Sequence, residues 1–186
     1  MLELIKVFRH QVQFELLQMM NDMRPVAEIY LVHALAKDIH AAVAELRTLG
    51  FAVAGQYSGW NSVTFFVSKD SVLAKEATRT TDQRRFGELM GFPTTAIDAF
   101  IAHGELMSHE ELQELVGFEL GEMFMHVKFA KAHPNDAVEY VRKSMKILLE
   151  QAPQLLEEML PRGIDPREHK EKVTRFVYAD DALQKN

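Results

Sequence analysis

Apolar side chains recur at three- and four-residue steps along the first 23 residues of the chain. The repeating positions are Leu2, Ile5, Phe8, Val12, Leu16, Met19 and Met23. This spacing predicts a helix over residues 2–23, inside an N-terminal segment of residues 1–24 that Pro25 ends. Such an apolar face covers either the core of the chain or a second copy of it, and the pattern leaves both interpretations open.

A different pattern follows over residues 25–68, where β-branched and aromatic residues cluster in short runs. These runs predict strands over residues 27–33, 51–57 and 62–68. Between the first two strands, Asp38 is a candidate N-cap of a helix that Gly50 ends. Residues 58–61 join the last two strands as a hairpin. The order strand, helix, strand, strand predicts a small antiparallel or mixed sheet.

From residue 69 to residue 160 the apolar positions return to helical spacing. Helices are predicted over residues 70–80, 82–90 and 95–102, after Ser108, and from Pro134 to a break at Pro153, with a second segment beyond it. Thr94 is a candidate cap of the third helix, and Ser108 with Glu111 forms a capping box for the fourth, which stops at Gly117. Residues 119–131 fit a strand and a helix equally well.

The C-terminal residues complete the predicted fold. Residues 173–178 predict a last strand, and the polar residues 179–186 predict a frayed tail. No linker or internal repeat separates the sheet-forming third from the helical remainder. We therefore expect residues 1–186 to form a single α+β domain, in which the small sheet packs against a predominantly helical C-terminal part.

Composition and charge exclude several classes of protein. The net charge of −6 argues against general nucleic-acid binding. No apolar run approaches the roughly 18 residues of a membrane span, and residues 1–6 lack the basic segment and apolar core of a signal peptide, so we expect no membrane association and a cytoplasmic location. The absence of cysteine excludes disulfides, thiolate metal ligands and a cysteine nucleophile. Glycine-rich phosphate loops and a nucleophile elbow are also missing, and we expect no cofactor.

A candidate small-molecule pocket lies near residues 92–100. Arg84 and Arg85 belong to a basic run, and guanidinium groups hold phosphate or carboxylate through paired hydrogen bonds. Together with Thr94, Thr95 and His126 they form the candidate ligand-binding set. Trp60 in the predicted hairpin is a further candidate, as an apolar wall. The ordinary alternatives are a solvated helix face for the arginines and packing at the end of the sheet for Trp60.

A second set of residues is a candidate metal site. His126 and His133 bracket an apolar stretch and a turn, and Glu122 lies four residues before His126. On a helix, residues four apart share a face, and imidazole with carboxylate suits a divalent ion. A surface histidine or a hydrogen-bonded core histidine is the ordinary alternative.

Residues 86–100 read Phe-Gly-Glu-Leu-Met-Gly-Phe-Pro-Thr-Thr-Ala-Ile-Asp-Ala-Phe. This stretch resembles the signature Leu-Gly-x-Leu-Leu-Gly-Tyr-Pro-x-Cys-Cys-Val-x-x-Phe of an uncharacterised prokaryotic family, which carries a His-x-Pro-Cys region downstream. The resemblance covers residues 60–150. It aligns the paired cysteines with Thr95 and Ala96, and the downstream Pro-Cys with Lys128 and Phe129. It therefore implies a retained scaffold that has lost a thiol-based site.

Three functions remain open at this point. The first is a non-enzymatic binding or regulatory protein that acts as a homodimer through its N-terminal helix or its long C-terminal helix, because 10 Met and 12 Phe enrich the apolar faces and no catalytic constellation occurs. The second is a small-molecule enzyme or ligand-binding protein with the pocket near residues 92–100. The third is a histidine and carboxylate metalloprotein. The sequence identifies neither a ligand nor a protein partner, and it does not decide whether the chain is an enzyme.

Overall fold

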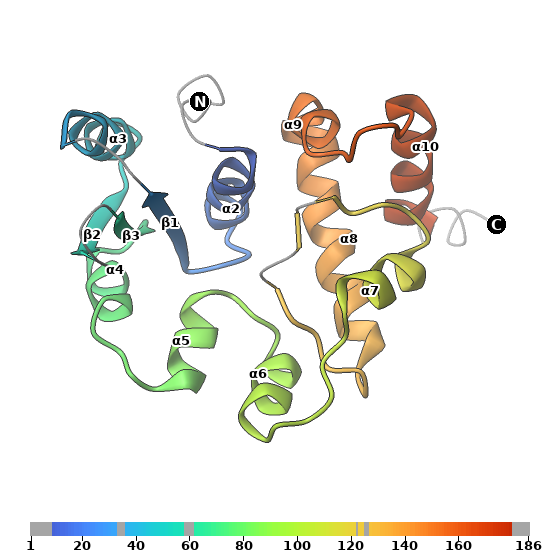
Figure 1. Ribbon diagram of the computed structural model, residues 1–186, viewed down its shortest axis with the longest axis horizontal. Coiled ribbons are helices and arrows are strands. Elements are labelled where there is room, and N and C mark those ends of the chain that lie inside the picture. Colours follow the sequence, from blue (N-terminus) through green and yellow to red (C-terminus); the bar gives the residue numbers. More distant parts are fainter. Residues whose placement is uncertain (1–8, 33–35, 58–61, 122, 125–126, 180–186) are drawn as a thin grey trace. The chain divides into compact units, whose positions relative to one another are not determined.

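The computed structural model describes residues 9–32, 36–57, 62–121, 123–124 and 127–179. The chain forms two compact units, residues 1–92 and 93–186 (Figure 1). We call the first the sheet unit and the second the helical unit. A three-stranded antiparallel sheet accompanied by helices confirms the predicted α+β fold class. That the two units share one core in a single domain stays a prediction.

The described elements of the sheet unit follow the predicted order. They are α2 (His10–Met20), β1 (Val26–Val32), α3 (Ala36–Thr48), β2 (Ala52–Tyr57), β3 (Ser62–Ser68), α4 (Ser71–Ala77) and α5 (Gln83–Leu89). The predicted helix over residues 2–23 is therefore confirmed for its described central part. One detail is wrong: α3 begins at Ala36, so Asp38 lies in its first turn and is not its N-cap. Gly50 has a φ of 85° and ends the helix as predicted.

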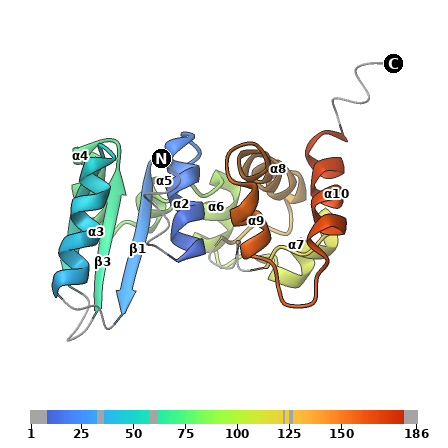
Figure 2. The same ribbon diagram turned by 90° about the horizontal axis from the view of Figure 1, so that it is seen from above.

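The strands lie in the order β1-β3-β2, and both pairings are antiparallel. Because β3 is central, residues 63–68 are all buried. Val67 faces Ala27 on one side and Val53 on the other, so apolar side chains continue across the sheet. Figure 2 shows β1 between β3 and α2, and α2 packs on β1. The apolar side chains of α2 thus contribute to packing within the chain, as the core interpretation expects.

One apolar cluster joins the sheet to the two helices that follow it. It contains Val26, Phe66, Ala77, Leu89 and Met90. The rings of Phe66 and Phe86 meet edge to face with their centroids 6.2 Å apart, which suits the aromatic quadrupole. Gly91 closes α5 with a φ of 73°, and a Cβ there would collide with Arg24. The turn after α5 therefore requires glycine for its conformation and for its close approach to Arg24.

The helical unit is built mainly from five described helices. They are α6 (Thr94–Ile101), α7 (His109–Val116), α8 (Pro134–Gln151), α9 (Pro153–Glu158) and α10 (Pro166–Val177). The capping box of Ser108 and Glu111 is present, and Gly117 ends α7 in the left-handed conformation, as predicted. Pro153 separates α8 from α9, which is the predicted break. The described residues of the ambiguous stretch 119–131 form neither a helix nor a strand, apart from a single bridge between Leu106 and Ala130.

Two predictions for the helical unit are wrong. The N-cap position of α6 is Pro93, so Thr94 is the first helical residue and not the cap. The predicted strand over residues 173–178 is the last part of α10. Asp165 accepts the backbone N–H of Arg167 and Pro166 occupies the first turn, so a helix starts here before the β-forming residues are reached. His169, Val173 and Val177 then bury one helical face.

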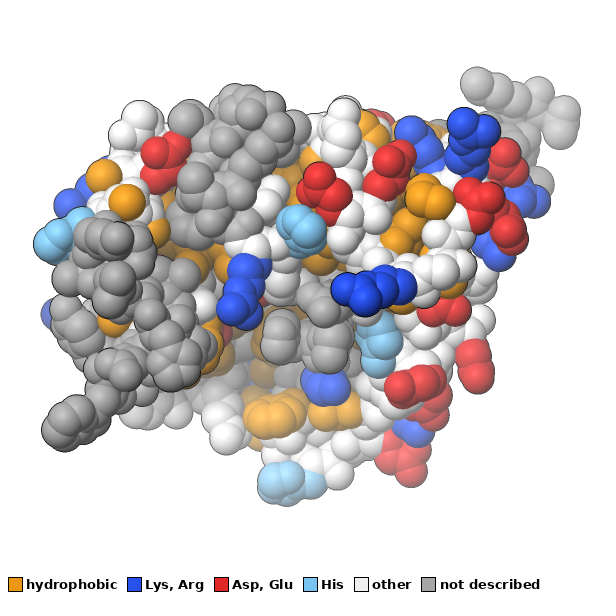
Figure 3. All heavy atoms as spheres, turned by 45° about the horizontal axis from the view of Figure 1, so that its top comes forward, with side chains coloured by type: hydrophobic (Ala, Val, Ile, Leu, Met, Phe, Trp, Pro, Cys, Tyr) orange, Lys and Arg blue, Asp and Glu red, His pale blue; other side chains and the backbone are white. Residues whose placement is uncertain are grey.

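No described helix is long and apolar enough to cross a membrane. On the face drawn in Figure 3, acidic and basic side chains are interspersed. The hairpin loop 58–61 and residues 180–186 of the tail lie outside the described residues.

Candidate functional site

An open groove of about 690 Å³ lies in the helical unit. Its lining comes from two stretches of chain, the residues of α6 with the turn after it and the residues just before α8. They are Thr95, Asp98, Ala99, Ala102, Gly104, Glu105, Ala130, Lys131, Ala132 and His133. Half of these residues are alanine or glycine, so the short side chains leave the space open while charged groups stand among them.

The turn after α6 brings the chain back along the helix. His103 has a φ of 52°, and the N–H of Gly104 donates to the carbonyl of Ala99 at 2.7 Å. A Cβ on Gly104 would lie 3.3 Å from the same carbonyl oxygen, so glycine suits this close return. The turn sets residues 104 and 105 beside the last turn of α6 and makes one end of the groove.

Backbone pairing then joins the two stretches that line the groove. The N–H of Met107 donates to the carbonyl of Phe129 at 2.7 Å, and the N–H of Lys131 donates to the carbonyl of Glu105 at 3.0 Å. Leu106 and Ala130 form the antiparallel bridge between these bonds. The pairing is short, but it fixes residues 130–133 against residues that are distant in the sequence.

A side-chain hydrogen bond connects the starts of two helices at the groove. The hydroxyl of Thr95, in the first turn of α6, donates to the carboxylate of Asp136 at 2.6 Å. Asp136 lies in the first turn of α8, where a negative charge interacts favourably with the unpaired N–H groups of the helix. The hydroxyl of Thr95 is therefore held in one direction.

The lysine of the groove is already paired. The ammonium of Lys131 lies 2.6 Å from the carboxylate of Glu111, and both side chains are partly exposed. This hydrogen bond raises the pKa of Lys131 and, with the backbone N–H of Ser108, lowers the pKa of Glu111. Asp98 and Glu105 add two carboxylates to the lining, and His133 adds an imidazole at the start of α8. Among the lining residues there are two carboxylates, Asp98 and Glu105, and one lysine, Lys131, which is bonded to Glu111.

Of the predicted site residues that the structure describes, two lie together. Thr95, from the ligand-binding set, and His133, from the metal set, line the same groove. Thr94 is exposed at the start of α6 and does not belong to the lining. Trp60, Glu122 and His126 lie outside the described residues. Across the described part of the chain, no group of three or more histidines and carboxylates is placed to hold a metal ion.

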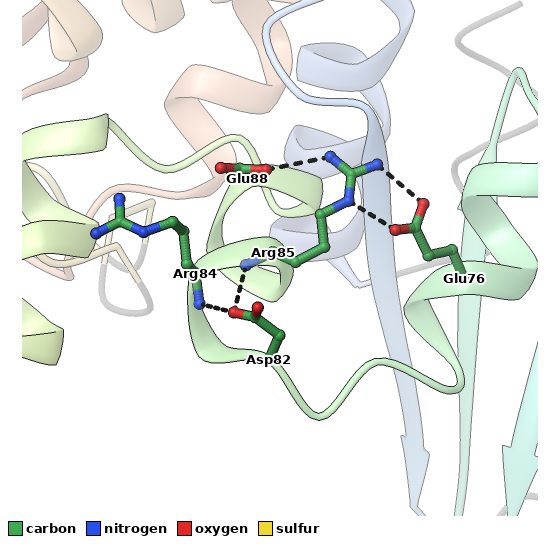
Figure 4. A network of polar contacts seen from close by, with 5 residues as sticks. All are labelled: Glu76, Asp82, Arg84, Arg85 and Glu88. Carbon is green, nitrogen blue, oxygen red and sulfur yellow. Dashed lines mark hydrogen bonds and ion pairs between the residues drawn. The ribbon is translucent and has the colours of Figure 1, made fainter.

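Arg85, a predicted anion ligand, is bonded to two carboxylates in the sheet unit (Figure 4). Its guanidinium donates to both oxygens of Glu76, at 2.6 and 2.9 Å, and to Glu88 at 3.1 Å. These bonds raise the pKa of Arg85, and the hydrogen bond from Arg85 lowers the pKa of Glu76. We call Glu76, Arg85 and Glu88 the arginine clamp. An anion would have to displace a carboxylate of the clamp to reach this guanidinium.

Arg84 lies beside the clamp without joining it. Its backbone N–H, like that of Arg85, donates to the side chain of Asp82, which is the N-cap of α5. Figure 4 shows the side chain of Arg84 directed away from Glu76 and Glu88. The two neighbouring arginines therefore have different surroundings, although the sequence suggests one basic run.

Sequence reasoning missed Asp98, Glu105 and Lys131. Nothing in their spacing connects them, because the groove depends on the pairing of residues 105–107 with residues 129–131. The one available signal was the pair of segments that the family resemblance singles out. Thr95 lines the groove, and Lys128 and Phe129 lead directly into its second stretch.

Comparisons with protein-family models, with curated proteins and with solved structures found no match to this chain. The resemblance to the Gly-Tyr-Pro-x-Cys-Cys family therefore stays a prediction.

Proposed function

We propose that this chain is a non-enzymatic binding protein, and that its groove takes a small ligand with a positively charged group next to a short apolar part. The observation that carries the proposal is the groove itself, with alanine and glycine in half of its lining and carboxylates around it. A volume of about 690 Å³ lies within the range of about 300–1,000 Å³ that is usual for small-molecule sites.

The balance of charges favours a cation as the ligand. Asp98 and Glu105 bring two carboxylates to the lining, and the ammonium of its lysine, Lys131, is bonded to Glu111. An anion would meet these carboxylates and would compete with Glu111 for the lysine. A guanidinium or ammonium group would gain hydrogen bonds to charged acceptors, which are the stronger kind. The alanines beside them suit a short alkyl chain.

Calorimetric titration with n-butylguanidinium and n-butylammonium, beside butyrate and n-butanol, tests this proposal. We expect the two cations to bind and the other two probes to bind more weakly. The double variant Asp98→Asn/Glu105→Gln removes both lining charges and should weaken binding about tenfold or more, as expected for lost hydrogen bonds to a charged group. Glu139→Gln is the matched control, because Glu139 pairs with Lys143 on α8 away from the lining. Preferential binding of butyrate would contradict the proposal.

The enzyme alternative is favoured by one specific feature of the groove. Thr95 donates a short hydrogen bond to Asp136, and His133 lines the same groove. A hydroxyl bonded to a carboxylate, with an imidazole in the same lining, offers the group types that acid–base chemistry uses. Mass spectrometry of a bound ligand after incubation separates the two functions, because an enzyme returns a changed molecule and a binding protein returns the same one.

Homodimer formation is a separate part of the proposal. The apolar face of α8 is buried against α7, α9 and α10, and α2 packs on β1, so these helical faces contribute to packing within the chain. Phe100 and Ile101, which are 53% and 37% exposed at the end of α6, are apolar side chains that a second copy would cover. A strict monomer in light scattering at micromolar concentration would remove this part.

The metalloprotein alternative has less support from the described residues. His133 belongs to the groove, while Glu122 and His126 lie outside the described residues. Elemental analysis of the purified, chelator-free protein tests it, and a stoichiometric transition metal would favour it over the binding proposal.

A further inference from the structure

The last described helix, α10, attaches to the rest of the helical unit through one narrow face. His169, Val173 and Val177 are the buried residues of this helix, and their spacing places them in one line. α10 packs on α8, and the two helices lie side by side in Figures 1 and 2. Most other residues of α10 are exposed, so the attachment of the helix depends on few side chains.

His169 is a polar member of that face and is almost fully buried, with 3% of its surface exposed. Its Nε2 lies 2.6 Å from the backbone carbonyl of Glu119, in the segment after α7. A carbonyl only accepts, so Nε2 carries the proton and donates. The imidazole ring also meets Phe118 edge to face, with ring centroids 5.6 Å apart. The imidazole therefore links α10 to Glu119 by a hydrogen bond and to Phe118 by a ring contact.

The second ring nitrogen of His169 has no hydrogen-bond partner among the described residues. Nδ1 is buried, and with Nε2 acting as the donor it is the unprotonated nitrogen. A proton added to Nδ1 would create a buried N–H and a buried positive charge without an acceptor. Both are unfavourable away from water.

We propose that His169 is a proton-sensitive attachment point, which holds α10 in place while its imidazole is neutral and releases α10 when the imidazole is protonated. The neutral ring satisfies the carbonyl of Glu119 and packs on Phe118. The charged ring keeps the first bond but gains the unsatisfied N–H. In the released state water can bond the added N–H and solvate the charge. The released state therefore binds the proton more tightly, and a lower pH favours it.

The charged groups around the imidazole do not remove the cost of protonating it in the attached state. Burial is the largest influence on the pKa of His169, and it lowers that pKa; the positive charge of Lys172 lowers it further. The hydrogen bond to the Glu119 carbonyl and the negative charge of Glu119 raise the pKa, but the net direction is downward. Lys172 itself pairs with Glu168 on α10. On the facing helix α8, Arg142 lies over the ring of Phe176, 5.3 Å from its centroid, and adds a second cation to this interface.

The sign of the pH dependence follows from the lowered pKa. An unfolded or released His169 takes up a proton near its ordinary pKa of about 6.5, and the attached one does so only at lower pH. The stability that His169 contributes is fully present above about pH 6.5 and is lost as the pH falls below it. The released population should rise by up to about tenfold for each pH unit in that window.

Hydrogen exchange of the wild-type protein at about pH 7.5 and about pH 5.5, on either side of the ordinary histidine pKa, tests the proposal. After correction for the intrinsic rates, amides 166–177 should exchange faster at the lower pH, by up to about tenfold, while amides 63–68 of β3 should not. His169→Gln keeps a side-chain donor but cannot be protonated, and should remove this pH dependence. His109→Gln, in α7 of the same unit, should retain it.

A second measurement on the wild-type protein covers the case in which His169→Gln does not fold. An NMR titration should show the ring of His169 with a pKa below about 6.5. Titration at or above that value, or exchange of amides 166–177 that is equal at both pH values, would overturn the proposal.

Discussion

The charged groups considered in the two units have different surroundings. In the sheet unit, Arg24 and Arg85 are each surrounded by acceptors from the chain itself. In the helical unit, Asp98 and Glu105 stand around an open volume. The sequence draws attention to Arg85, because it belongs with Arg84 to a basic run. A charge that is prominent in the sequence is therefore not by itself evidence of a binding site, because the fold can supply its partners, as Glu76 does for Arg85.

The largest loss of stability is expected from a substitution at Arg24, whose contacts are buried. The guanidinium lies 2.9 Å from the carboxylate of Glu15 and donates to the carbonyl of Val26 at 2.7 Å, with 5% of the Arg24 side chain exposed. Arg24→Ala leaves the Glu15 charge buried, so the free energy of unfolding should fall by about 3 kcal/mol or more. Urea denaturation measures this loss.

The double variant Arg24→Met/Glu15→Leu is the control for this prediction. It removes both charges and keeps apolar volume, so it should be more stable than Arg24→Ala. If Arg24→Ala changed the free energy of unfolding by less than about 0.5 kcal/mol, as is typical of surface positions, the buried pairing of Arg24 with Glu15 would not stabilise the sheet unit as we expect.

A substitution in the lining of the groove should change stability little and ligand binding strongly. Ala132 is an exposed lining residue, and Ala132→Trp should fill part of the groove while it changes the free energy of unfolding by about 0.5 kcal/mol or less. Binding of n-butylguanidinium should weaken about tenfold or more, since the bulky ring occupies the space of the alkyl chain. Val72→Trp is the matched control, because Val72 is 67% exposed on α4 in the sheet unit. Undiminished binding by Ala132→Trp would place the ligand elsewhere.

The smallest of these expected effects follows from removing the guanidinium of the arginine clamp. Arg85 and its carboxylates are partly exposed to solvent, so Arg85→Gln should destabilise the protein less than Arg24→Ala does. Because Arg85 lowers the pKa of Glu76, the clamp contributes stability above the ordinary carboxyl pKa of about 4.5 and loses it as the pH falls through the lowered value. An NMR titration should therefore show the pKa of Glu76 rising in Arg85→Gln. A pKa of Glu76 that is the same in both proteins would contradict the geometry of the clamp.

Much of the fold was predictable from the sequence, because local signals agreed with it. The three strands, Gly50, the capping box of Ser108 and Glu111, and the break at Pro153 all follow from short patterns with a physical cause. The last helix was not predicted, because residues 173–178 are β-forming by composition. The cap at Asp165 and the burial of one face against α8 outweigh that preference.

The candidate site was less predictable than the fold. Thr95 and His133 were selected for different sites, and they line one groove because residues 105–107 pair with residues 129–131. Arg85 was selected for its charge, but Glu76 reaches it from the preceding helix. Long-range contacts decide both outcomes, and a single sequence does not display them.

An NMR titration of the ¹⁵N-labelled protein with n-butylguanidinium tests the central claim most directly, because it reports where a cation binds. The account predicts saturable shifts in the amides of residues 95–105 and 130–133, and no comparable shifts around residues 76–88. Saturable shifts that centre on the arginine clamp, or shifts spread evenly over exposed carboxylates of both units, would contradict it.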